Sequence, residues 1–197
     1  MTKAWPVSGV DPSGTLVDNA RRILGVRMAE FYSYAPIVLD ETAVTELHNL
    51  RIAAKRLRYT LELFRTAFGE PGEKQIERVR DVQELLGQIH DHDVRIELIQ
   101  DELKVLASEQ TVELGRTLAS SPTTAHNSIT AAALRPQPDD PRRGLLGLLG
   151  RQYTTRHNTY ISFVELWIKL AEEGMRTDLV RLSARELPDR STEISVT

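Results

Sequence analysis

The stretch Glu46-Leu-His-Asn-Leu-Arg-Ile-Ala-Ala-Lys-Arg-Leu-Arg-Tyr-Thr-Leu-Glu62 decides how this chain folds. Its apolar residues recur at three- and four-residue steps, which predicts a helix with one buried face: Leu47, Leu50, Ala54, Leu57, Leu61 and, beyond the stretch, Phe64. At about 100° per residue, a second stripe lies beside that face and consists of His48, Arg51, Lys55, Arg58 and Glu62. Arg56 lies off this stripe. The sequence therefore predicts a row of basic side chains along one edge of the buried surface.

Two interpretations of this row are open. A helix that only needs to be solvated usually alternates charges, because opposite charges four residues apart stabilise it by about 0.2–0.5 kcal/mol per pair. Here Arg51, Lys55 and Arg58 carry like charges that repel one another unless an anion lies between them. Arginine also binds phosphate oxygens with a planar fork. These features favour a focused anion site over a solvated surface.

The pattern His48-x-x-Arg51-x-x-x-Lys55-Arg56-x-Arg58-Tyr59-x-x-Glu62 resembles the signature of the CHAD domain, the conserved-histidine α-helical domain. The later run Leu86-Gly-Gln-Ile-His90-Asp-His-Asp-Val94 is similar to the second signature of that family, with His90 where the family often has Arg or Asn. The resemblance covers about residues 16–107. It implies an all-α antiparallel helical bundle that binds inorganic polyphosphate in a basic cavity. The site residues expected on this basis are His48, Arg51, Lys55, Arg56, Arg58, Arg21, Arg22 and His90.

A full CHAD domain contains two related helical halves, whereas this chain carries one good copy of the motif. The resemblance therefore implies one motif-bearing half of the bundle. A symmetric homodimer would bring two such halves together, and we hold this as an expectation.

Composition limits the function further. The chain has 197 residues, a formal net charge of −3, 41% hydrophobic and 27% charged residues and no cysteine. Disulfides and thiolate chemistry are thus excluded. The N-terminus lacks the apolar core of a signal peptide, and no run approaches the roughly 18 apolar residues of a membrane span. We expect a soluble, cytoplasmic protein. The slight acidity argues against a general nucleic-acid binder.

The expected elements follow from periodicity and turn residues. Residues 1–14 are expected to be flexible, 15–176 to form the CHAD-like domain and 177–197 to be a tail. Within the domain, helices are expected at about 15–35, 40–68, 73–88, 93–106 (continuing less securely to 118) and 145–175. Asp40 or Thr42 is expected to cap the second of these helices, and Gly69-Glu-Pro-Gly72 to form a turn. Residues 119–143 are expected to be a flexible connection with a short helical piece near 129–134.

His90-Asp91-His92-Asp93 permits two readings. Asp91 or Asp93 can cap a new helix at a junction between two helices. Alternatively, His90 and Asp91 are ligands in a metal-dependent phosphohydrolase, which needs at least a third converging ligand.

We expect binding without catalysis, with no cofactor and no metal, because no nucleophile beside a base is visible. Rival functions are the phosphohydrolase and a binding module for RNA or an acidic protein. Association with polyphosphate granules or with an enzyme of phosphate metabolism is open.

Overall fold

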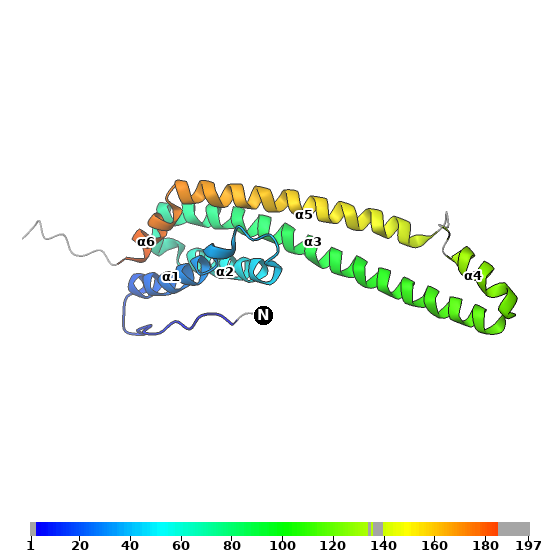
Figure 1. Cartoon of the computed structure of the whole chain (residues 1–197). Coiled ribbons are helices and arrows are strands. Elements are labelled where there is room, and N and C mark those ends of the chain that lie inside the picture. The colour runs from blue at the N-terminus through cyan, green and yellow to red at the C-terminus, as the bar shows by residue number, and fades with distance from the viewer. Residues whose placement is uncertain (1–2, 134, 136–139, 185–197) are drawn as a thin grey trace, which may run out of the picture. The chain divides into compact units, whose positions relative to one another are not determined.

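The computed structural model of the chain describes residues 3–133, 135 and 140–184. Within these residues the secondary structure is helical and includes no strand (Figure 1), which confirms the all-α prediction. The elements are α1 (Leu16–Tyr32), the 3-10 helix η1 (Ala35–Ile37), α2 (Val44–Leu63), α3 (Arg65–Ser120), the 3-10 helix η2 (Thr123–Ala125), α4 (His126–Ala133), α5 (Pro141–Glu172) and α6 (Met175–Ser183).

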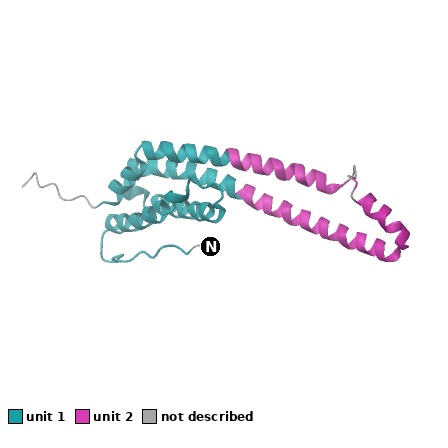
Figure 2. Ribbon diagram, in the orientation of Figure 1, with its two compact units in different colours: residues 1–90, 159–197 teal, residues 91–158 magenta. Residues whose placement is uncertain are grey.

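The chain divides into two compact units, which Figure 2 shows in different colours. Unit 1 comprises residues 1–90 and 159–197, and unit 2 comprises residues 91–158. Both α3 and α5 contribute residues to each unit.

Helix α1 begins where the sequence predicts. Thr15 is its N-cap, and the Thr15 hydroxyl oxygen accepts a hydrogen bond of 3.1 Å from the backbone N–H of Asp18. Ala20, Leu24 and Phe31 are buried on one face of the helix. The helix ends at Tyr32, a few residues before Pro36.

Helix α2 has the buried face that its periodicity predicts, with Leu47, Leu50, Leu57 and Leu61 fully buried. The predicted cap is wrong. Helix α2 follows Ala43, which has no side-chain capping hydrogen bond. The Asp40 carboxylate instead accepts hydrogen bonds from the backbone N–H and the hydroxyl of Thr42, which closes a local turn ahead of the helix.

The predicted turn at residues 69–72 is a break inside α3. Gly69 has φ 57° and ψ −151°, a backbone conformation that is essentially restricted to glycine. Gly72 packs so closely that a Cβ added to it would lie 2.5 Å from the Cβ of Phe68. Pro71 stands at the restart of the helix, where its missing N–H costs little.

The predicted helix junction at residues 90–93 is wrong, because α3 runs without interruption through it. Neither aspartate is needed as a cap. Asp93 accepts a hydrogen bond from Nε of Arg156. The Nδ1 atom of His92 lies 2.8 Å from Oε1 of Gln152. Both pairs join α3 to α5 within unit 2.

The core of unit 1 is completed by residues late in the chain. Phe163 of α5 and Leu179 of α6 are fully buried, and Met175 is nearly so. The hydroxyl of Tyr160 donates a buried hydrogen bond of 2.9 Å to the carbonyl of Val38. Helix α6, which periodicity did not predict, packs against α1 and carries the helical region past the expected boundary at residue 176.

The expected connection at 119–143 is more ordered than predicted over its described part. Helix α3 extends to Ser120, and α4 provides the short helical piece, although it begins earlier than predicted. Residues 134 and 136–139 and the expected tail from 185 onward lie outside the described residues. None of the described helices is both long enough and apolar enough to cross a membrane.

Candidate anion-binding site

The buried leucines of α2 fix which way its basic residues point. His48, Arg51 and Arg58 are half-buried beside the apolar face, whereas Lys55 is exposed. The burial pattern thus agrees with the position that the sequence assigns to these four residues, which we call the α2 row.

His90 of α3 lies directly against His48 of α2. Their Nδ1 atoms are 3.3 Å apart and their ring centroids 4.5 Å apart. One imidazole can donate its N–H to the other while both are neutral. If both are protonated they repel each other, unless an anion accepts from both rings. The structure therefore brings the two sequence signatures together at one point.

Arg51 lies one turn along α2 from His48. Its Nε is buried and makes no hydrogen bond to any of the described residues. This Nε is 3.7 Å from the position that a Cβ on Gly87 would occupy, so the side chain lies over a part of α3 that has no side chain of its own. Because buried polar groups in proteins are nearly always hydrogen-bonded, this unpartnered donor needs an explanation.

The surroundings of His48 disfavour its protonated form. Burial lowers the pKa of the His48 imidazole below its ordinary value of 6.5, and the positive charges of His90 and Arg51 lower it further. The free site therefore holds His48 mainly uncharged at neutral pH.

Two cations at the far end of the α2 row, Lys55 and Arg58, lie near the ring of Tyr59. Nζ of Lys55 is 5.7 Å and Cζ of Arg58 is 5.1 Å from the centroid of the Tyr59 ring. Cations at such distances are attracted to an aromatic face. Nε of Arg58 lies 3.5 Å from Oε1 of Glu62 and forms an ion pair within α2, although the two groups are not aligned as a hydrogen bond.

Arg56 lies in a different environment, next to a buried acid. Nη1 of Arg56 donates to Oε1 of Glu30, and Nη1 of Arg27 donates to Oε2 of the same carboxylate. The Glu30 side chain is only 2% exposed. Arg27 also donates to the backbone carbonyl of Trp5, so the expected flexible N-terminal segment is held against α1 at this point. A buried carboxylate needs such partners, and Arg56 supplies one.

Arg21 and Arg22 lie near the start of α1. They line a shallow hollow together with Asp11, Asp18 and Ser183. In the described part of the chain, neither arginine makes a hydrogen bond or ion pair with the α2 row. Their predicted role in anion binding stays a prediction.

Sequence reasoning missed two buried arginines. Arg156 pairs with Asp93 in unit 2, and Arg78 pairs with Asp178 and Glu173 in unit 1. Both lie on the apolar faces of their helices: Arg78 is one turn before the buried Val82, and Arg156 is one turn before the buried Tyr160. That placement was the available signal, because a charged residue in an apolar stripe needs a partner.

His90 and Asp91, the proposed metal ligands, do not converge with a third. Across the described residues, no group of three or more His, Asp or Glu side chains has an arrangement that could hold a metal ion.

These features define an all-α protein in which His48, from the first signature, lies on α2 against His90, from the second signature, on α3. The model of the CHAD domain family matches residues 3–100, a segment that includes both signatures. This half of the chain therefore belongs to the CHAD family, as the resemblance indicated. The comparisons with curated proteins and with solved structures gave no significant match.

Proposed function

We propose that the α2 row, together with His90, binds inorganic polyphosphate or a similar polyanion without catalysing a reaction. The observation that carries the proposal is the buried, unpartnered Nε of Arg51 beside the paired imidazoles of His48 and His90. A phosphate oxygen would satisfy this donor and would separate the two rings. Membership of the CHAD family supports a polyphosphate ligand.

The chemistry of each residue suggests its role. Arg51 and Arg58 would make forked contacts with phosphate oxygens, and Lys55 would act as a point charge. His48 and His90 would donate hydrogen bonds. From His48 to Arg58 the row extends about 15 Å along the helix, which suits a linear anion with charges repeated at close spacing. Arg56 is not needed as a direct contact to phosphate, because it donates a hydrogen bond to the buried carboxylate of Glu30.

The test is the affinity for long-chain polyphosphate at two salt concentrations. We expect tight binding that weakens steeply with salt, because bound counterions are released. The variant Arg51→Ala/Lys55→Ala/Arg58→Ala should lose most of the affinity and show a shallower salt dependence, by about one in slope for each cation removed. Circular dichroism checks that the variant is folded.

The matched control removes three cations elsewhere: Lys104→Ala/Arg116→Ala/Lys169→Ala. All three side chains are about 70% exposed or more. This control changes the net charge equally and should keep most of the affinity. Equal weakening by both variants would mean that binding depends only on net charge, and the proposal would fail.

Two further experiments address the rival functions. Competition with RNA distinguishes a polyphosphate site from an RNA site. Phosphate release on adding divalent metal would favour the phosphohydrolase.

A further inference from the structure

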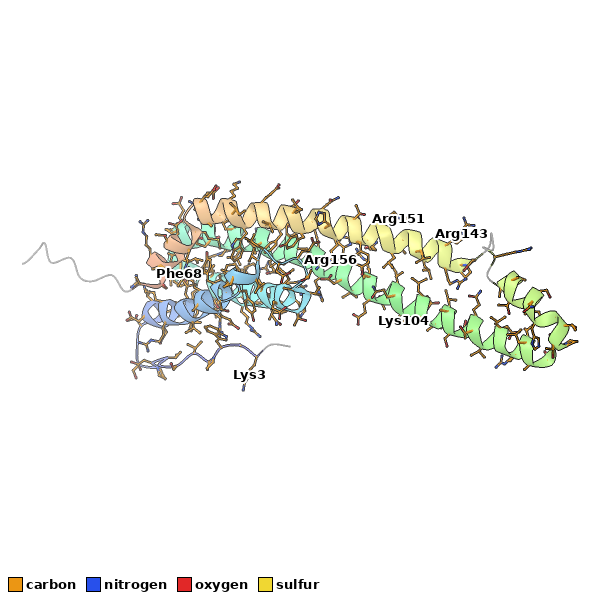
Figure 3. All side chains as sticks on the ribbon, viewed as in Figure 1. Lys3, Phe68, Lys104, Arg143, Arg151 and Arg156 are labelled. Carbon is orange, nitrogen blue, oxygen red and sulfur yellow. The ribbon has the colours of Figure 1, made fainter. Side chains whose placement is uncertain are left out.

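A cavity of about 360 Å³ lies in unit 1 and is lined by residues of α1, α3, α5 and α6. Unit 1 holds the hydrophobic core, to which Phe68, labelled in Figure 3, belongs. Among the described residues of unit 2, by contrast, only Ile96, Ile99 and Arg156 are buried. Sites for small molecules are typically concave, mostly apolar and about 300–1,000 Å³ in volume. The cavity of unit 1 has the size of such a site.

The floor of this cavity is apolar and buried. Phe31, Val82 and Met175 line it and are no more than 2% exposed. Tyr32 and Trp167 also line it but are half-buried, so each leaves part of its ring free. An apolar group that enters the cavity would leave water for apolar surface, which is favourable.

Three aromatic rings meet at the cavity. The ring centroids of Phe31 and Tyr32 are 5.0 Å apart, with the ring planes at 82°. The Trp167 ring lies 5.3 Å from that of Phe31 and 6.0 Å from that of Tyr32. Aromatic rings attract one another in edge-to-face and offset arrangements at about these separations. A ligand that carries an aromatic ring would extend this cluster.

The charge at the cavity is positive. Among the described residues that line it, Arg176 is the only charged one, and none is acidic. Cζ of Arg176 lies 5.2 Å from the centroid of the Tyr32 ring, which holds the guanidinium over that ring. In the described part of the chain Arg176 makes no ion pair, whereas Glu173 and Asp178 pair with Arg78. The guanidinium of Arg176 is thus available to an anionic group.

The hydroxyl of Tyr32 is a second hydrogen-bond donor beside Arg176. Burial raises the pKa of Tyr32 to about 12, although the positive charges of Arg176 and Arg78 oppose this shift. The hydroxyl therefore keeps its proton at neutral pH, and it makes no hydrogen bond to the residues that the structure describes. Because Arg176 lies over the Tyr32 ring, one carboxylate can accept from both groups.

We propose that this cavity binds a small molecule in which a short apolar chain joins an aromatic ring to a carboxylate. The ring would pack against Tyr32 and Trp167 above the buried floor, and the carboxylate would accept hydrogen bonds from Arg176. No residue of the α2 row lines the cavity, so the proposal does not depend on polyphosphate binding.

The test compares two probes of nearly the same size, 3-phenylpropionate and 3-phenylpropanol. Trp5→Phe leaves Trp167 as the only tryptophan, so a change in tryptophan fluorescence on binding reports on the cavity. In this background we expect saturable binding of the acid, about tenfold tighter than binding of the alcohol, because hydrogen bonds between charged groups are the stronger ones. Titration calorimetry checks both affinities.

Two variants in the same background test the part that charge plays. Arg176→Leu should bind the acid about tenfold more weakly, since a hydrogen bond between charged groups is lost, and should bind the alcohol as before. The matched control Arg181→Leu removes the same charge from the same helix at a side chain that is 77% exposed. It should leave both affinities unchanged.

A second pair of variants tests the location. Ala171→Phe places a ring at an exposed position that lines the cavity, so it should abolish binding of both probes and leave the affinity for polyphosphate unchanged. Ala107→Phe adds the same ring at an exposed position of α3 in unit 2 and should alter neither probe. Three results would overturn the proposal: no saturable binding of the acid, equal affinities for acid and alcohol, or binding that survives Ala171→Phe.

Discussion

His48 and His90 are joined by a contact that depends on the state of protonation of both rings. At neutral pH the lowered pKa of His48 allows the two imidazoles to lie 3.3 Å apart, with one ring donating to the other. The charged neighbours that act on His48 are His90 on α3 and Arg51 on α2, and both oppose a further positive charge. A bound anion would reverse this balance, because it stabilises protonated imidazole.

We therefore predict opposite effects of acid on affinity and on stability. Between about pH 7.5 and pH 5.5 the affinity for long-chain polyphosphate should rise, by about tenfold for each unit by which binding raises the pKa of His48. Over the same range the free protein should lose stability. The pKa of His48 is lowered in the folded state, so the unfolded chain binds more protons than the folded chain below about pH 6.5. Titration calorimetry and urea unfolding at the two pH values measure these effects.

His48→Asn is the matched variant for this prediction, since an asparagine donates hydrogen bonds but does not titrate in this range. It should bind with a weaker dependence on pH. An unchanged pH dependence in His48→Asn would assign the effect to a different group.

At the scale of single residues, the sequence predicted which α2 side chains form the row but not all of their partners. The spacing of the apolar residues fixes which way every other side chain of the helix points. The position of the α2 row therefore followed from the buried leucines. The pairing of Arg56 with Glu30 depends on contact between α1 and α2, which are separated along the chain. Periodicity within one helix cannot give such a contact.

Among the elements, the break at Gly69 separates the end of α2 from the long part of α3. We predict that Gly69→Ala lowers the free energy of unfolding by about 1–3 kcal/mol, because a Cβ is strained at φ 57°. Gly115→Ala is the control within the same helix. Its added Cβ meets no atom within 4 Å, and it should stabilise the protein slightly. Urea unfolding monitored by circular dichroism measures both, and equal effects would contradict the assigned role of Gly69.

The two helix starts that the sequence misplaced share one cause. Asp40, Asp91 and Asp93 have the side chains that cap helices, and that preference suggested two helix starts. In the structure Asp40 closes a turn and Asp93 pairs with Arg156. Capping residues also serve these other purposes, and the choice depends on distant partners that local sequence does not reveal.

For the whole molecule, the two units differ in how much they bury. We predict that backbone amides of residues 91–158 exchange with solvent faster than those of α2, because opening a unit with few buried apolar side chains costs less free energy. Hydrogen exchange measured by mass spectrometry tests this. Equal protection of both units would show that unit 2 has a source of stability beyond the contacts described above.

The hydrogen bond from Tyr160 to Val38 bears on where this protein can be divided. The family match ends at residue 100, yet Tyr160, Phe163, Met175 and Leu179 fill the core of the matched segment. A fragment cut at that limit would keep every residue of the α2 row and would still leave a large apolar surface open to water. Boundaries for expression, crystallisation or fusion to other proteins should therefore follow the packing, with residues 3–184 kept together.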